Sequence, residues 1–199
     1  MSAYESEMAH ESEFRAGRQL GLNHLKLGMW IFIASEVMFF GGLIATFLKY
    51  KLTLPTPEVA HLDVTLVGAN TFLLLTSSFT LVLALAGLRD NRRGAFMGNL
   101  LVTVLLGAAF LGGQGFEFAT LYGEGVTLTS SLFGSTFFTL TGFHGLHVLV
   151  GVIWALVLLV RGGRGAYSAD NDLGVEIFGL YWHFVDVVWI VLFTLIYLI

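Results

Sequence analysis

The chain has 199 residues, of which 56% are hydrophobic and only 12% are charged, and its mean hydropathy is +0.80. A soluble domain carries about a quarter charged residues, so this composition excludes a soluble globular protein. The net charge of -4 comes without any basic cluster, so nothing indicates a nucleic-acid partner, and the absence of cysteine excludes disulfides and thiolate-bound metal clusters.

The apolar residues form five runs, each long enough to cross a bilayer, which takes about 20 residues of helix. We predict transmembrane helices over residues 25–50, 64–88, 96–121, 132–160 and 175–199. Barrel strands would be shorter and would alternate in polarity, so the fold class is an all-α bundle. Residues 1–24 are polar and lack the apolar core of a cleaved signal peptide. We therefore expect a tail, residues 1–24, before one membrane domain, residues 25–199.

Basic residues gather on one side of the predicted bundle. That side holds Arg15, Arg18, Lys26, Arg89, Arg92, Arg93, Arg161 and Arg164, and the other side holds only Lys49 and Lys51. Because basic loops stay inside the cell, we expect a cytoplasmic N-terminus and an outside C-terminus.

In the first predicted helix, Glu36 stands alone among apolar and aromatic residues. An ionisable group at this depth is costly to desolvate, so it faces protein, a partner or an ion path. It is either an acid that exchanges protons, or a neutral carboxyl bonded to a backbone carbonyl or a neighbouring helix. The residues alone leave both open.

In the second and third predicted helices, polar residues share faces. Asn70, Ser77 and Thr80 align on the second helix, and Gln114 and Glu117 share a face of the third near its outer end. Since Glu117 lies near a helix end, like Glu176 of the fifth helix, we expect both to contact solvent or lipid headgroups.

The fourth and fifth predicted helices carry the densest intramembrane polar residues. His144 and His147 are three residues apart, and His183 and Asp186 continue a stripe that begins at Glu176. Three histidines and a carboxylate could bind a metal or haem. They could also form a hydrogen-bonded network that ties the fourth helix to the fifth. We favour the network because ligand spacing alone is weak evidence.

Three segments resemble signatures of a known family. They are residues 28–40 (GMWIFIASEVMFF), residues 133–148 with FGSTFF and TGFHGLHV, and residues 181–189 (YWHFVDVVW). They are similar to subunit III of haem–copper oxidases, the cytochrome c oxidase and ubiquinol oxidase family. Gln114, Glu117 and Glu176 also stand where that pattern places them, and the resemblance runs from residue 28 to the C-terminus.

The resemblance implies a non-catalytic subunit of an aerobic terminal oxidase in the bacterial plasma membrane. Such a subunit has no active site, haem or metal of its own, and it packs against subunit I, which holds haem and copper, and near subunit II. It supports assembly, sustained proton uptake during oxygen reduction to water, and phospholipid binding. Proton translocation belongs to the whole complex.

The resemblance also implies roles for single residues. Glu36 matches the family's buried, carbodiimide-reactive glutamate. His144, His147, His183 and Asp186 match motif positions that are structural, which adds weight to the network. Gln114, Glu117 and Glu176 match positions to which the family assigns lipid or subunit contacts.

The chain departs from the family pattern in one respect, and two alternatives remain open. Longer family members carry two more helices before the segment that matches residue 28, and these form one wall of a lipid cleft. We expect another subunit to supply that wall here. The alternatives are an accessory subunit of a nitric oxide reductase and an autonomous b-type cytochrome that uses the intramembrane histidines.

Overall fold

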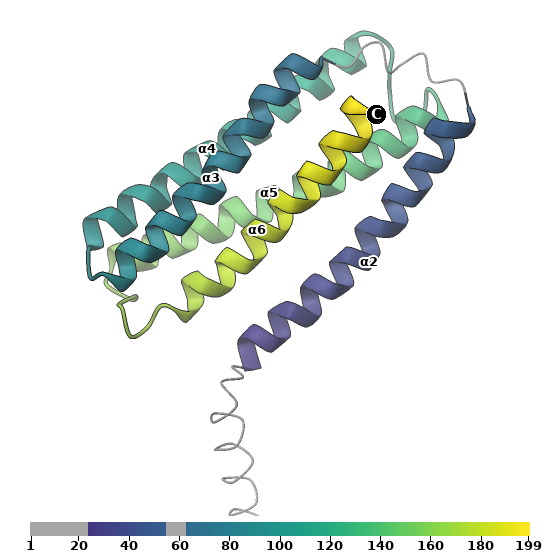
Figure 1. The fold of residues 1–199 in the computed structure, drawn as a ribbon. Coiled ribbons are helices and arrows are strands. Elements are labelled where there is room, and N and C mark those ends of the chain that lie inside the picture. The colour runs from purple at the N-terminus through teal and green to yellow at the C-terminus, as the bar shows by residue number, and fades with distance from the viewer. Residues whose placement is uncertain (1–23, 55–62) are drawn as a thin grey trace, which may run out of the picture.

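The computed structural model describes residues 24–54 and 63–199, and five long helices make up this part of the chain (Figure 1). They are α2 (His24–Thr53), α3 (Val64–Arg89), α4 (Arg93–Gly123), α5 (Leu132–Gly163) and α6 (Leu173–Phe193), which continues into a π-helical turn (Thr194–Leu198). All five are long and apolar enough to cross a membrane, with mean hydropathies of 1.8 to 2.3. The predicted all-α class and its five spans are therefore confirmed. The predicted tail, residues 1–24, lies almost wholly outside the described residues.

Short polar side chains and tight turns set where the helices begin. The Asp63 carboxylate accepts hydrogen bonds from the N–H groups of Thr65 and Leu66, both at 3.0 Å, and so caps α3. The Ser131 hydroxyl caps α5 in the same way through the N–H of Gly134. Between α3 and α4, Asn91 has a φ of 57°, which lets the chain reverse direction in three residues.

The helices pack in two unequal parts. α3 and α4 form an antiparallel hairpin that lies against α5 and α6, and α2 packs on α5 and α6 from the opposite side (Figure 1). In its most apolar stretch, only 17% of α2 is buried, against 50% for α3 and for α6. The many exposed large apolar side chains on all five helices form the face that meets lipid or other subunits.

The centre of the bundle is built around Trp182 of α6. A Cβ atom at Gly107 of α4 would lie 2.8 Å from its indole ring, and one at Gly151 of α5 would lie 2.5 Å from it. These two glycines therefore make the space that the ring fills. The indole N–H donates to the Ser77 hydroxyl of α3 at 2.9 Å, so one side chain joins four helices.

Candidate functional site

Glu36 of α2 and His147 of α5 form a pair at the middle of the bundle. Their Oε2 and Nε2 atoms are 3.2 Å apart, and the two side chains are only 17% and 16% exposed. The other ring nitrogen of His147, Nδ1, lies 2.7 Å from the Phe143 carbonyl, which can only accept. Nδ1 must therefore carry a proton, and Nε2 is left facing the carboxyl. Oε2 and Nε2 are thus placed so that a proton on either atom would lie between them.

This pair lines a groove of about 420 Å³ between α2, α5 and α6. Apart from the pair, the lining is apolar or aromatic, and it consists of Met29, Phe32, Leu146, Val150, Trp154 and Tyr181. Several of these side chains are exposed, so the groove opens on the membrane-facing surface. The Tyr181 hydroxyl donates to the His147 carbonyl at 2.8 Å and fixes the groove's α6 wall to α5.

His183 and Asp186 of α6 turn to α3, away from the groove. Nδ1 of His183 lies 2.7 Å from the Ser78 hydroxyl, and the Asp186 carboxyl lies close enough to share that hydroxyl. The second carboxyl oxygen of Asp186 is buried and has no hydrogen-bond partner among the described residues. The polar stripe expected on the fifth predicted helix, α6, is therefore directed mainly at the second predicted helix, α3.

His144 of α5 is fully buried among aromatic rings. It stacks on Trp189 with a ring-centroid distance of 4.8 Å and meets the edge of Phe110 at 5.9 Å. Neither ring nitrogen has a hydrogen-bond partner in the described part of the chain. Its tie to α6 is thus a stacking contact, and Trp189 is itself fixed to Thr71 of α3 through its indole N–H at 2.9 Å.

The four residues grouped from the sequence thus point to different neighbours. Within residues 24–54 and 63–199, no hydrogen bond joins His144, His147, His183 and Asp186 to one another. In the same residues, no three histidine, aspartate or glutamate side chains converge as metal ligands do. The ring of His144 is enclosed by aromatic side chains, so this donor set does not fit a haem or a metal ion.

Gln114 and Glu117 of α4 face the interior. The Gln114 amide donates to the Thr141 carbonyl of α5 at 2.7 Å. The Glu117 carboxylate accepts from the Tyr197 hydroxyl at 2.7 Å and is only 7% exposed. This differs from the solvent or headgroup contact expected for Glu117, because the π-helical turn that ends α6 places Tyr197 beside it.

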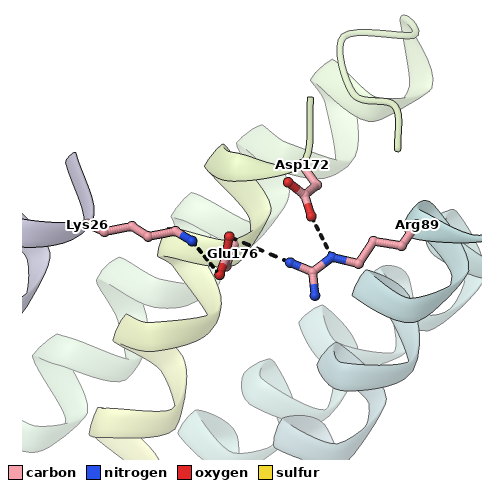
Figure 2. Close-up of polar contacts among 4 residues, drawn as sticks. All are labelled: Lys26, Arg89, Asp172 and Glu176. Atoms are coloured by element: carbon pink, nitrogen blue, oxygen red, sulfur yellow. Dashed lines mark hydrogen bonds and ion pairs between the residues drawn. The ribbon is translucent and has the colours of Figure 1, made fainter. Parts of the chain in front are cut away.

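Glu176 lies in an ionic cluster at the opposite end of the bundle, drawn in Figure 2. Its carboxylate is 2.7 Å from the Lys26 ammonium of α2 and 3.6 Å from the Arg89 guanidinium of α3. Asp172, just before α6, pairs with the same Arg89 at 2.5 Å. This cluster joins three helices. No sequence pattern indicates which of these charges meet, because the members of the cluster lie up to 150 residues apart.

Comparisons with known proteins place the chain among oxidase subunits. A family model described as cytochrome c oxidase subunit III matches residues 1–199. A cytochrome c oxidase subunit 3 of Bacillus subtilis (strain 168) is 42% identical over 177 residues, which cover 86% of this chain and 84% of that protein. A probable quinol oxidase subunit 3 of Staphylococcus saprophyticus is 38% identical over 197 residues, 96% and 97% of the two chains. One of Staphylococcus aureus (strain USA300) is 40% identical over 179 residues, 87% and 88%.

Proposed function

This chain belongs to the cytochrome c oxidase subunit III family, and from that membership we propose that its groove and its Glu36–His147 pair are the part that serves the catalytic subunit. The chain is a non-catalytic subunit of a haem–copper oxidase and a multi-pass protein of a bacterial plasma membrane, where it associates with other oxidase subunits. The relatives' names do not support a nitric oxide reductase subunit or a b-type cytochrome.

In this proposal the chain packs against subunit I, which carries the haems and copper, and lies near subunit II. Its N-terminus, with the polar residues 1–24, lies in the cytoplasm. The groove takes a phospholipid acyl chain, because its walls are apolar and it opens toward the membrane. A wall supplied by a neighbouring subunit would close it, and the subunit would thereby support assembly and sustained proton uptake.

The observation that carries the proposal is the 3.2 Å contact between Glu36 Oε2 and His147 Nε2 inside an otherwise apolar groove. A proton held between these two atoms can pass from one to the other while the net charge of the pair stays the same, so this transfer adds no unpaired charge to the membrane. The pair also leaves a carboxyl within reach of an apolar reagent that enters from the lipid. His144, His183 and Asp186 are structural in this proposal and hold α5, α6 and α3 together.

The test is labelling of the intact oxidase complex with dicyclohexylcarbodiimide, an apolar reagent that attacks carboxyl groups. We expect label on this chain in the wild type and none in Glu36→Gln, with assembly intact. Glu117→Gln is the matched control, because Glu117 is a second buried acid that faces the interior instead of the groove. Labelling that persists in Glu36→Gln, or that disappears in Glu117→Gln, would contradict the assignment.

A second measurement separates a functional groove from a merely reactive carboxyl. We expect the Glu36→Gln complex to begin oxygen consumption at the wild-type rate and to lose activity several-fold sooner during continuous turnover. If the Glu36→Gln complex kept its activity for as long as the wild type, the proposed role of Glu36 in sustained proton uptake would be wrong. Identifying the proteins that copurify with a tag on this chain tests the contacts with subunits I and II.

A further inference from the structure

A second cavity lies at the end of the bundle where α4 and α6 begin, between the α3–α4 turn and the loop that joins α5 to α6. Its volume is about 220 Å³. The buried side chains of Leu88 and Phe96 form its apolar part, and Asn91, Arg93 and Ser168 bring polar groups to it. By the charge rule this is the cytoplasmic end, at the level of the lipid headgroups.

Arg93 differs from the two other arginines of this turn in its partners. Arg89 is paired with Asp172, and Arg92 is paired with Asp90 at 2.6 Å, so these two carboxylates are already engaged. Arg93 makes no ion pair within the described residues and bonds only to backbone carbonyls. Its positive charge is therefore not compensated by any carboxylate of the described residues.

Only one nitrogen of the Arg93 guanidinium is used to cap the C-terminal end of α5. One nitrogen, Nη2, donates to the carbonyls of Gly162 and Gly163 at 3.2 and 2.6 Å. Nη1 is directed toward Gly165, where a Cβ atom would lie 4.0 Å from it. Nε and Nη1 donate to no acceptor in residues 24–54 and 63–199, and both belong to a side chain that lines the cavity.

Two further residues with hydrogen-bond donors in their side chains line the same cavity. The Asn91 amide and the Ser168 hydroxyl make no side-chain hydrogen bond to any described residue. The backbone at both is held in place: Asn91 donates its N–H to the Leu88 carbonyl, and Ser168 accepts from the N–H of Asn171 at 3.0 Å. A guanidinium, an amide and a hydroxyl thus belong to three exposed residues that line one small cavity, and a compact oxyanion is an acceptor suited to all three.

We propose that this cavity binds a phosphate group, carried either by a phospholipid headgroup or by free inorganic phosphate. The arginine supplies the charge and two donors, and the amide and hydroxyl supply the others. The apolar floor of Leu88 and Phe96 suits the glycerol end of a lipid, whereas free phosphate would use the polar part alone. The site is separate from the Glu36–His147 groove and does not depend on the function proposed for it.

The test uses the delipidated oxidase complex in phosphate-free detergent. Native mass spectrometry counts bound dioctanoyl phosphatidylglycerol per complex, and isothermal titration calorimetry measures inorganic phosphate. We expect Arg93→Gln to lose one bound ligand and to weaken its affinity about tenfold, which corresponds to about 1.4 kcal/mol. Arg164→Gln is the matched control, because it removes the same charge from the neighbouring turn at a residue that does not line the cavity.

Each outcome decides the proposal. Loss of phosphatidylglycerol alone identifies a lipid site, and loss of inorganic phosphate alone identifies a free-anion site. Because Arg93 also caps α5, Ser168→Ala serves as a second variant, and it should weaken binding about threefold while leaving the complex assembled. Wild-type binding of both probes in Arg93→Gln and Ser168→Ala, or an equal loss in Arg164→Gln, would overturn the proposal.

Discussion

Helices α6 and α2 are attached to the same bundle by different means. α6 inserts two tryptophans between its neighbours, and both indole N–H groups are bonded to hydroxyls of α3, Trp182 to Ser77 and Trp189 to Thr71. α2 buries far less of its length and is attached by three polar side chains: Lys26 near its start, Glu36 near its middle and Lys51 near its end.

The attachment at the end of α2 uses an unusual acceptor. The Lys51 ammonium donates to the carbonyls of Leu195 and Ile196, at 3.0 and 2.9 Å, within the π-helical turn. Carbonyls at a helix end have no partner within the helix, so a cation there is favourable.

The two modes of attachment, that of α6 and that of α2, follow from the lipid bilayer that surrounds the helices. In a bilayer, burying apolar surface between helices gains little, because lipid is just as apolar, so close packing and polar contacts must supply the association. α6 relies on close packing around glycines, which tolerates no change of shape. α2 relies on a few polar contacts and on the buried rings of Phe40 and Phe47, and most of its surface stays available to lipid or to another subunit. We therefore expect substitutions in the two regions to differ in size and in kind.

The largest effect should come from filling the space around Trp182. Gly151→Ala would place a Cβ atom 2.5 Å from the indole ring, so the ring must move and strain its bond to Ser77. We expect the free energy of unfolding to fall by about 3 kcal/mol. The measurement is thermal unfolding of the complex in detergent, followed by size-exclusion chromatography. Gly142→Ala on the same helix is the control, since a Cβ atom there meets nothing within 4 Å. Equal losses in both variants would show that the packing is not specific.

A smaller effect should follow from removing a hydrogen-bond acceptor. Ser77→Ala leaves the buried N–H of Trp182 without its acceptor, which should cost about 1–2 kcal/mol by the same measurement. Thr76→Ala is the neighbouring control, because the Thr76 hydroxyl is exposed and bonds only to the Phe72 carbonyl of its own helix. A Ser77→Ala complex as stable as the control would mean that the indole N–H finds another acceptor.

Hydropathy alone predicted the helices, because a bilayer admits few other ways to satisfy the backbone. It also singled out the intramembrane polar residues, since each is conspicuous in an apolar run. What it could not supply was the direction of each side chain. His183 and Asp186 turn to Ser78 of α3, whereas the sequence favoured a tie to the fourth helix. Rotation of one helix about its axis decides this, and it depends on the packing of all its neighbours.

Contacts between residues far apart in the chain could not be predicted from the sequence either. Glu36 could be recognised as an acid within an apolar helix. Its pairing with His147, however, could be predicted only if the packing of α2 on α5 were known. The position of Tyr197 beside Glu117 depends on the π-helical turn, and no pattern in an apolar C-terminal run predicts a single wider turn. Helical periodicity places residues on a face but does not say which neighbour that face meets.

The smallest effect on stability should come from the start of α2. Lys26→Gln removes the ion pair with Glu176, and because both side chains are partly exposed we expect a loss of only about 0.5 kcal/mol. Hydrogen exchange over the first turns of α2 should nevertheless increase, while exchange in α6 stays unchanged. Lys49→Gln is the control, since Lys49 makes no ion pair within the described residues. If Lys26→Gln lowered global stability as much as Ser77→Ala, α2 would belong to the same tightly packed unit as α6, and the contrast between the two helices would fail.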